Sequence, residues 1–193
     1  MIQSICVYCA SSTQIDECYF QAAHQLGARM AQAGITLVNG AGNQGLMRAT
    51  TDGCLEAGGK AIGVIPTFMI RENWCHTGMT QIVETPDMHI RQEKMAELSD
   101  AAIVLPGGCG TLAELMELIT WKQLGLYLKP IIILNVNGYF NPVLQQLETA
   151  ASQHFMRPQH TAIWQVAETV DQALQLAIDT PLWDTRVRRF AAI

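Results

Sequence analysis

The chain has 193 residues, of which 49% are hydrophobic and 15% are charged, and its formal net charge is −5 at pH 7. This length fits a single domain over residues 1–193 with a full hydrophobic core. The acidic balance argues against non-specific nucleic-acid binding, which relies on clustered Lys and Arg. Membrane insertion is not expected either, because no apolar run approaches the roughly 20 residues that a span needs.

The cysteines and the N-terminal segment indicate a cytoplasmic protein. The segment Met-Ile-Gln-Ser-Ile-Cys has no basic region ahead of an apolar one, so it does not resemble a signal peptide. Six cysteines in a chain of this length do not suggest a disulfide framework, which is typical of short secreted proteins. Cys6 and Cys9 form a Cys-x-x-Cys, but Cys6 lies within an apolar strand, and no second pair with zinc spacing follows. We therefore expect structural cysteines and no metal site.

Short runs rich in Val, Ile, Leu and Ala are the predicted strands. They show little alternation with polar residues, which indicates burial on both faces of a sheet. The predicted strands cover residues 5–8, 35–38, 61–65, 81–84, 101–105, 130–134 and 162–166.

Helical periodicity fills most of the intervals between these strands. Ala22, Leu26 and Met30, for example, are spaced for one face of a helix. Residues 67–79 show no clear period, and the segment from Pro181 onward is expected to be helical. The other predicted helices cover residues 15–33, 46–57, 89–98, 111–124, 142–153 and 170–178.

Strands that alternate with helices imply parallel crossover connections. We therefore predict an α/β fold with a doubly wound, mostly parallel, Rossmann-like sheet. Ligands in such sheets bind at the carboxyl ends of the strands. That edge is predicted to carry Ser11, Ser12 and two glycine-rich loops.

The stretch Pro-Gly-Gly-Cys-Gly-Thr-Leu-Ala-Glu at residues 106–114 carries the strongest functional signal. Glycines between a strand and a helix let backbone N–H groups approach an anion closely, and the helix N-terminus adds positive potential. Glu114 would stand beside that anion, which suggests chemistry on a phosphorylated substrate. The alternative is a capping box, in which Thr111 and Glu114 satisfy the first N–H groups of a helix that begins at Thr111. The predicted phosphate contacts are Gly107, Gly108, Gly110 and Thr111.

The second glycine-rich loop, Gly-Ala-Gly-Asn-Gln-Gly at residues 40–45, matches the Gly-x-Gly-x-x-Gly pattern of dinucleotide folds. Those folds also place an acidic residue at the end of the next strand to hold a ribose hydroxyl. Here the next strand ends in Pro66 and Thr67, so a mononucleotide fits better than NAD or FAD. Gly40 and Gly42 would then lie near the sugar or base, unless the loop is only a turn that needs glycine for backbone reasons.

Two further segments contribute candidate site residues. Asp87 is a predicted N-cap, and Arg91 follows in the first turns of a helix, where a cation needs a partner such as a phosphate or Glu114. A lone histidine near a helix start, His89, is more typical of a structural hydrogen bond than of catalysis. Glu117 follows Glu114 by one helical turn and is either a pocket residue or a solvated carboxylate.

Together these motifs resemble the Lonely Guy family of cytokinin-activating phosphoribohydrolases, which were long described as lysine decarboxylases. The family pattern Pro-Gly-Gly-x-Gly-Thr-x-x-Glu is matched at residues 106–114 without a gap. The family's Gly-Gly-Gly-x-x-Gly-Leu-Met loop is similar to residues 40–47, where Ala41 replaces a glycine, and its Asp-Met-His-x-Arg stretch is matched at residues 87–91. The similarity extends over nearly the whole chain, as far as Asn-Val-Asn-Gly-Tyr-Phe at residues 135–140.

The resemblance implies hydrolysis of the N-glycosidic bond in a purine nucleoside 5′-monophosphate, either AMP or an N6-substituted AMP, to a free base and ribose 5-phosphate. It makes Arg91 and Glu114 the catalytic pair, without a cofactor or metal. Glu114 would stabilise positive charge on the ribose, attack the anomeric carbon or activate water, and Arg91 would orient Glu114 or bind ribose or phosphate. A homodimer with sites near its interface is also implied. The other expected substrate contacts are Ser11, Ser12, Gly40, Gly42, Glu72, Met88, Glu117 and Thr120.

The chain departs from the family pattern at two positions that bear on substrate preference. Gln92 stands where many members have lysine, and Cys109 replaces the usual Tyr, Phe or Ser. One alternative function is a non-catalytic nucleotide- or molybdenum-cofactor-binding carrier of similar fold. Pyridoxal-phosphate-dependent decarboxylation would instead need a Schiff-base lysine beside a glycine loop. No lysine has that position among Lys60, Lys94, Lys122 and Lys129.

Overall fold

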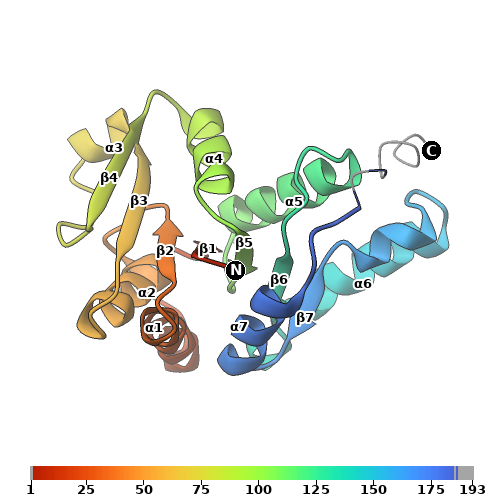
Figure 1. The fold of residues 1–193 in the computed structure, drawn as a ribbon, viewed down its shortest axis with the longest axis horizontal. Coiled ribbons are helices and arrows are strands. Elements are labelled where there is room, and N and C mark those ends of the chain that lie inside the picture. The colour runs from red at the N-terminus through yellow and green to blue at the C-terminus, as the bar shows by residue number, and fades with distance from the viewer. Residues whose placement is uncertain (1, 185, 187–193) are drawn as a thin grey trace.

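The computed structural model describes residues 2–184 and 186, and its strands form one sheet (Figure 1). Seven parallel strands lie in the order β4-β3-β2-β1-β5-β6-β7, which confirms the predicted doubly wound α/β fold. The strands are β1 Ser4–Tyr8, β2 Thr36–Asn39, β3 Ala61–Pro66, β4 Gln81–Thr85, β5 Ala101–Val104, β6 Ile131–Leu134 and β7 Gln165–Ala167.

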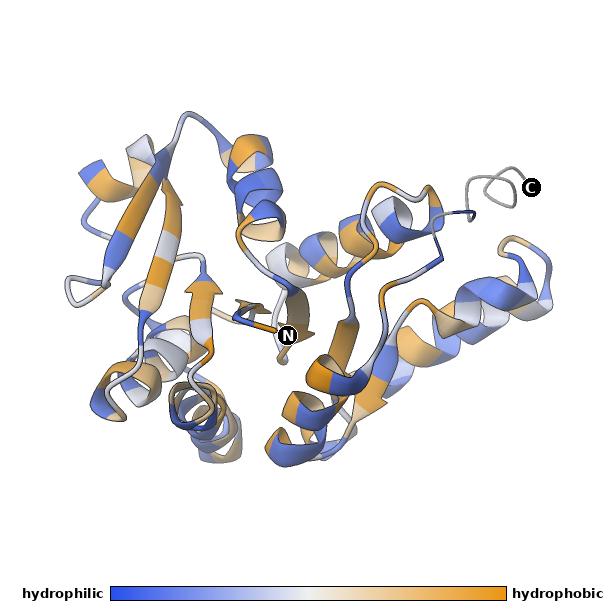
Figure 2. Ribbon diagram, in the orientation of Figure 1, coloured by the Kyte–Doolittle hydropathy of each residue, from blue (hydrophilic) through white to orange (hydrophobic). Residues whose placement is uncertain are grey.

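Helices cover both faces of this sheet. The helices α1, α2 and α7 contribute buried residues to one core, and α4, α5 and α6 contribute to the other. Figure 2 shows hydrophobic residues concentrated on the strands, whereas the helices are mixed. The helices are α1 Glu17–Gln32, α2 Gly45–Glu56, α3 Thr67–Arg71, α4 Met88–Glu97, α5 Cys109–Gln123, α6 Asn141–Ser152 and α7 Val170–Asp179, with short 3₁₀ helices at Val136–Gly138 and Pro158–Ala162.

The side chains of β1 show why its residues form a central strand. Ile5 and Val7 point into the core beneath α1, α2 and α7, whereas Cys6 and Tyr8 point into the core beneath α4, α5 and α6. All four residues are at most 1% exposed. An apolar run without polar alternation is therefore required here, because both faces of the strand are buried.

The strand order reverses direction between β1 and β5. The chain builds β2, β3 and β4 outward on one side of β1, and later builds β6 and β7 outward on the other side of β5. Tyr8 and Val104 are register partners at the carboxyl ends of these two strands. A reversal of this kind opens a crevice at the strand ends, which is the usual ligand position in doubly wound sheets.

Three sequence predictions need correction. Residues 67–79 contain the short helix α3, which is too brief to show a period. The last strand occupies Gln165–Ala167 instead of residues 162–166, because Pro158 starts a 3₁₀ helix that ends at Ala162. Residues 181–184 are not helical, and residues 185 and 187–193 of the expected C-terminal helix lie outside the described residues. In the described part of the chain, no helix has the length and apolar character needed to cross a bilayer.

Candidate active site

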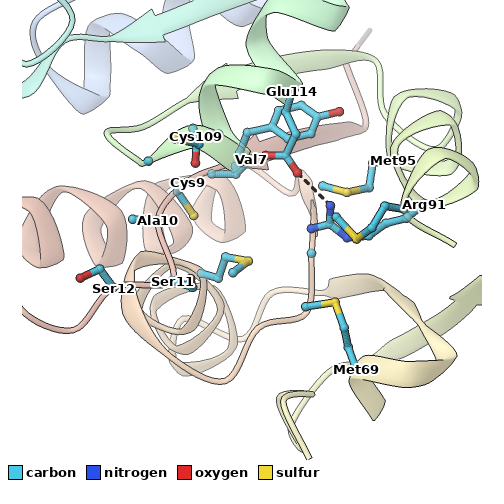
Figure 3. A pocket seen from close by; sticks show the side chains of 17 residues that line it. Val7, Cys9, Ala10, Ser11, Ser12, Met69, Arg91, Met95, Cys109 and Glu114 are labelled. Carbon is cyan, nitrogen blue, oxygen red and sulfur yellow. Dashed lines mark hydrogen bonds and ion pairs between the residues drawn. The ribbon is translucent and has the colours of Figure 1, made fainter. Parts of the chain in front are cut away.

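A cavity of about 370 Å³ opens at the reversal point between β1 and β5 (Figure 3). Residues from both halves of the sheet contribute to it, as the predicted position at the carboxyl ends of the strands requires. Figure 3 shows Glu114 and Met69 on opposite sides of this cavity, with Arg91 between them. Its wall consists of residues 7–12, Gly40, Met47, Met69, Met88, Arg91, Met95, residues 108–111 and Glu114.

An ion pair between Arg91 and Glu114 forms the charged part of this wall. The Nη1 atom of Arg91 donates to Oε1 of Glu114 at 2.8 Å, and the Nε atom donates to the carbonyl of Val64 at 3.1 Å. Only 6% of the Arg91 side chain and 13% of the Glu114 side chain are exposed. The predicted partner of Arg91 is thus Glu114, and the pair is held away from most of the solvent.

Arg91 reaches this position because of two local features. Asp87 caps α4, accepting from the backbone N–H groups of His89 and Ile90, as the sequence predicted. Gly40 leaves room for the guanidinium, since a β-carbon at that position would lie 1.9 Å from Nη2 of Arg91. A larger residue at position 40 would therefore displace the guanidinium from its present place beside Glu114.

The surroundings of Glu114 shift the pKa of its carboxyl group. Burial raises the pKa of its carboxyl group above the ordinary value, and the nearby charge of Glu117 adds to this effect. The charge of Arg91 and its hydrogen bond oppose the increase without cancelling it. A carboxyl group whose pKa is shifted toward neutrality is suited to proton transfer or to electrostatic work on a developing cation.

The glycine-rich loop after β5 differs in detail from the prediction. Helix α5 begins at Cys109, two residues before Thr111, and its N-cap is Gly108, which has no side chain with which to cap. The capping box of Thr111 and Glu114 is therefore wrong, because Glu114 lies beyond the first turn and bonds to Arg91 instead. Gly108 and Gly110 line the cavity, so the N-terminus of α5 opens onto it.

Gly107 lies behind this loop. A β-carbon at Gly107 would lie 2.1 Å from Oγ1 of Thr111, so no larger residue fits without displacing that side chain. The carbonyl oxygen of Gly107 accepts a hydrogen bond from the hydroxyl of Tyr139 at 2.7 Å. Gly107 therefore does not line the cavity itself but packs against Thr111, which does.

The second glycine loop contributes through Gly40, while Gly42 packs against Met47 beside the wall. Ala41 has a positive φ of 56°, and its N–H donates to Oδ1 of the buried Asn39 at 2.9 Å. The carbonyl of Ala41 accepts from the N–H of His76 at 2.8 Å. Asn39 and His76 therefore hold the loop through its backbone at Ala41, and Gly40 of this fixed loop lines the cavity.

The structure brings only some of the other predicted residues to the cavity. Ser11, Ser12 and Met88 line it, as expected. Glu72 is exposed at the end of α3, and Thr120 is exposed and donates to the carbonyl of Met116. Gly42 and Glu117 do not line the cavity either, and His89 is exposed on the surface.

Sequence reasoning missed most of the apolar wall. Met47, Met69 and Met95 line the cavity together with Met88. Met47 lies within the second glycine motif, but Met69 belongs to the unpredicted helix α3 and Met95 looks like an ordinary core residue. Only the three-dimensional fold brings these methionines together.

The lysines do not provide an amine for a Schiff base in this cavity. Lys60, Lys94, Lys122 and Lys129 all lie off its wall. Lys122 is 2% exposed, donates to the carbonyl of Lys129 at 2.8 Å and lies 5.4 Å from the ring centroid of Trp183. Burial lowers the pKa of Lys122 to about 8. In residues 2–184 and 186, no three His, Cys, Asp or Glu side chains are grouped to hold a metal ion.

The fold and the cavity define a Rossmann-like α/β protein with a glycine-rich loop at a helix N-terminus and a buried Arg–Glu pair at the reversal point of its sheet. The chain belongs to the family described as "Possible lysine decarboxylase", whose model matches residues 47–177. This is the Lonely Guy family that the sequence motifs resemble.

Several curated relatives are similar over most of the chain. The chain is 45% identical to "Cytokinin riboside 5'-monophosphate phosphoribohydrolase LOG1" of Arabidopsis thaliana over 157 residues, which cover 80% of this chain and 72% of the relative. The chain is also 40% identical to the "Cytokinin riboside 5'-monophosphate phosphoribohydrolase" of Rhodococcoides fascians over 157 residues, which cover 81% of this chain and 79% of the relative. The molybdenum cofactor carrier protein of Chlamydomonas reinhardtii matches in structure with a TM-score of 0.70, covering 92% of this chain and 99% of that chain. Its sequence identity is only 22%, so this match shows the fold alone.

Proposed function

We propose that the protein hydrolyses the N-glycosidic bond of a purine nucleoside 5′-monophosphate, AMP or an N6-substituted AMP, and releases the free base and ribose 5-phosphate. The observation that carries this proposal is the buried Arg91–Glu114 pair on the wall of a cavity that also contains the N-terminus of α5. The curated relatives named as cytokinin riboside 5′-monophosphate phosphoribohydrolases support the same reaction.

The two ends of the cavity fit the two ends of such a substrate. The 5′-phosphate would bind at residues 108–111, where backbone N–H groups and the helix N-terminus favour an anion. The base would lie against the methionines, whose polarisable thioethers adapt to flat aromatic groups. The ribose would then lie between them, next to Glu114 and Arg91.

Glu114 would carry out the central step. Cleavage of the bond between the base and C1′ leaves positive charge on the ribose, which a neighbouring carboxylate stabilises. We propose that Glu114 also takes a proton from the attacking water as the water oxygen bonds to C1′ and the bond from C1′ to the base nitrogen breaks. The departing base nitrogen takes a proton from solvent, and Glu114 afterwards releases its proton to solvent. Arg91 would hold the carboxylate in position and oppose the rise in its pKa that burial causes.

Two quaternary and cellular features are part of this proposal. Phe68, Trp74 and Met88 are large apolar residues near the cavity that remain about half exposed, which supports a homodimer with its sites near the interface. The six cysteine thiols support a cytoplasmic location, since thiols persist in reducing compartments. Sedimentation equilibrium tests the first feature, and a single-chain mass at micromolar concentration would contradict it.

The reaction is tested by release of free base from purified protein. The panel should contain AMP, N6-isopentenyl-AMP, other purine and pyrimidine monophosphates, and adenosine as the matched substrate without phosphate. We expect base release from one or both adenine monophosphates and little from adenosine. Binding of the monophosphates without any turnover would favour a carrier and overturn the proposal.

A further inference from the structure

A tyrosine outside the cavity is bonded to the back of the phosphate loop. The Tyr139 hydroxyl donates to the carbonyl oxygen of Gly107 at 2.7 Å, across 32 residues of sequence. Tyr139 is not a wall residue, whereas Gly108, the next residue after its bonding partner, is. The bond therefore connects the loop that faces the ligand with the segment that follows β6.

The chain around Tyr139 is shaped so that its hydroxyl reaches the loop. Asn137 and Gly138 have positive φ values of 53° and 70°, and this tight turn precedes Tyr139 and Phe140. Phe140 is fully buried, whereas 41% of Tyr139 is exposed. The Tyr139 ring makes edge-to-face contacts with Tyr19 at 6.0 Å and Phe140 at 5.2 Å between centroids. Ring packing thus holds the hydroxyl in place independently of the hydrogen bond.

The hydrogen bond fixes the direction of one peptide group. The carbonyl of Gly107 and the N–H of Gly108 belong to the same planar trans unit, so they point in opposite directions. Because glycine lies on both sides of this unit, rotation of the whole peptide meets little steric resistance. The Tyr139 hydroxyl opposes that rotation, since it would lose its acceptor.

We propose that Tyr139 is a positioning residue that sets the affinity of the site for the phosphate of the substrate. With the Gly107 carbonyl bound to Tyr139, the N–H of Gly108 stays available to the anion at the start of α5. If the peptide rotates, a carbonyl dipole replaces that N–H and repels the phosphate. The inference rests on the proposed function, because it takes the ligand at this loop to be the 5′-phosphate of a nucleotide.

The test compares Tyr139→Phe with wild type and with the control Tyr19→Phe. Both substitutions remove one hydroxyl from the same aromatic pair and keep the ring, but only Tyr139→Phe removes the bond to Gly107. Calorimetric dissociation constants of ribose 5-phosphate and AMP should rise about three- to tenfold in Tyr139→Phe, the usual effect of one lost hydrogen bond. The dissociation constant of adenosine should stay unchanged, and KM for AMP should rise with little change in kcat.

Each alternative outcome has a distinct meaning. Unchanged affinity for ribose 5-phosphate in a folded Tyr139→Phe protein would overturn the positioning role, as would an equal loss for adenosine or the same loss in Tyr19→Phe. Circular dichroism and the melting temperature verify folding. If Tyr139→Phe does not fold, Tyr139→His is the second variant, because its shorter ring places no donor at the position of the tyrosine hydroxyl, and it should show the same loss of affinity for ribose 5-phosphate. If wild type binds ribose 5-phosphate but releases no base, the proposed hydrolase fails, and the calorimetric comparison still tests Tyr139.

Discussion

Arg91 and Glu114 each lie near the beginning of a helix, and their side chains meet at 2.8 Å on the wall of the cavity. A cation near the N-terminus of α4 opposes the helix dipole, and the Glu114 carboxylate and the Val64 carbonyl compensate for that position. The Arg91–Glu114 ion pair consequently connects the N-terminal halves of α4 and α5 at the cavity where the ligand would bind. The predictions below follow from this arrangement and from two buried groups outside it.

Glu114→Gln should lower kcat by about 10²- to 10⁴-fold, the typical contribution of a positioned acid or base. Glutamine keeps an oxygen that accepts from Arg91 but carries no negative charge, so the dissociation constant for AMP should change little. Base release under single-turnover conditions and calorimetric binding measure the two effects. Glu93→Gln, on the exposed side of α4, is the matched control. Turnover near the wild-type rate in Glu114→Gln would remove Glu114 from the mechanism.

On the acid side of the pH profile (the acid limb), kcat/KM should begin to fall at a pH above the ordinary pKa of a glutamate carboxyl group. Burial raises the pKa of Glu114, and the proposed mechanism uses its ionised form, so activity should fall as the pH drops through that raised pKa. The limb should disappear in the residual activity of Glu114→Gln. An acid limb at the ordinary carboxyl pKa in wild type would contradict this account of Glu114.

Arg91→Met should destabilise the fold by about 3–5 kcal/mol near neutral pH, because it leaves a buried carboxylate without its partner. The pKa of Glu114 should rise further without Arg91. The folded variant then binds this proton more tightly than the unfolded chain, so its stability should decrease as the pH rises from the unfolded pKa through the raised folded pKa. Urea denaturation at about pH 5 and about pH 8 measures this trend. The double variant Arg91→Met with Glu114→Leu should recover much of the loss, and failure to recover any would point to another cause.

Lys122→Met should stabilise the protein by about 1–3 kcal/mol at neutral pH. Burial lowers the pKa of Lys122 from 10.5 to about 8, so the charged form is disfavoured in the folded state. The unfolded chain binds more protons between these pKa values, so wild-type stability should rise with pH over that window and the advantage of methionine should shrink. Chemical denaturation at about pH 7 and about pH 10 tests this, with exposed Lys60→Met as the control. A constant advantage at both pH values would contradict the assignment.

Asn39→Ala should destabilise the protein by about 1–3 kcal/mol and weaken nucleotide binding. The buried Asn39 side chain accepts from the N–H of Ala41 and donates to Thr51 at 2.9 Å, so it holds the strained second glycine loop. Asn43→Ala removes an exposed hydrogen bond from the same loop and should cost less than about 1 kcal/mol. Equal losses in the two variants, measured by urea denaturation, would show that Asn39 has no special role.

The order of the seven strands and of all α-helices except α3 could be predicted because these elements have clear local patterns. In β1, the residues that point to either face of the sheet are buried in a hydrophobic core, as the apolar run predicts. Gly34 follows a helix whose apolar residues recur with helical spacing. The residues at which helices and strands begin and end are harder to predict, because the backbone conformation at the flanking loops decides them. Helix α5 begins at Cys109 after the N-cap Gly108, although Thr111 looks like the better cap in the sequence.

The Arg91–Glu114 pair could be anticipated from charge, since a cation at a helix start needs a partner. The methionine wall and the bond from Tyr139 to Gly107 could not, because they depend on contacts between segments far apart in the sequence. Met69 lies on a five-residue helix with no detectable period, and the Tyr139 hydroxyl is positioned by two left-handed residues before it. Long-range packing of this kind leaves no local signature in the chain.

The reversal of strand order has a consequence for how the site is assembled. Arg91 follows β4, at the end of the first half of the sheet, whereas Glu114 follows β5, at the start of the second. Neither half alone contains both members of the pair or both glycine loops. The Arg91–Glu114 pair can form only after the two halves have docked. If this pair is the reactive centre, activity should appear as a late event in refolding and should require both pieces of a chain divided between α4 and β5.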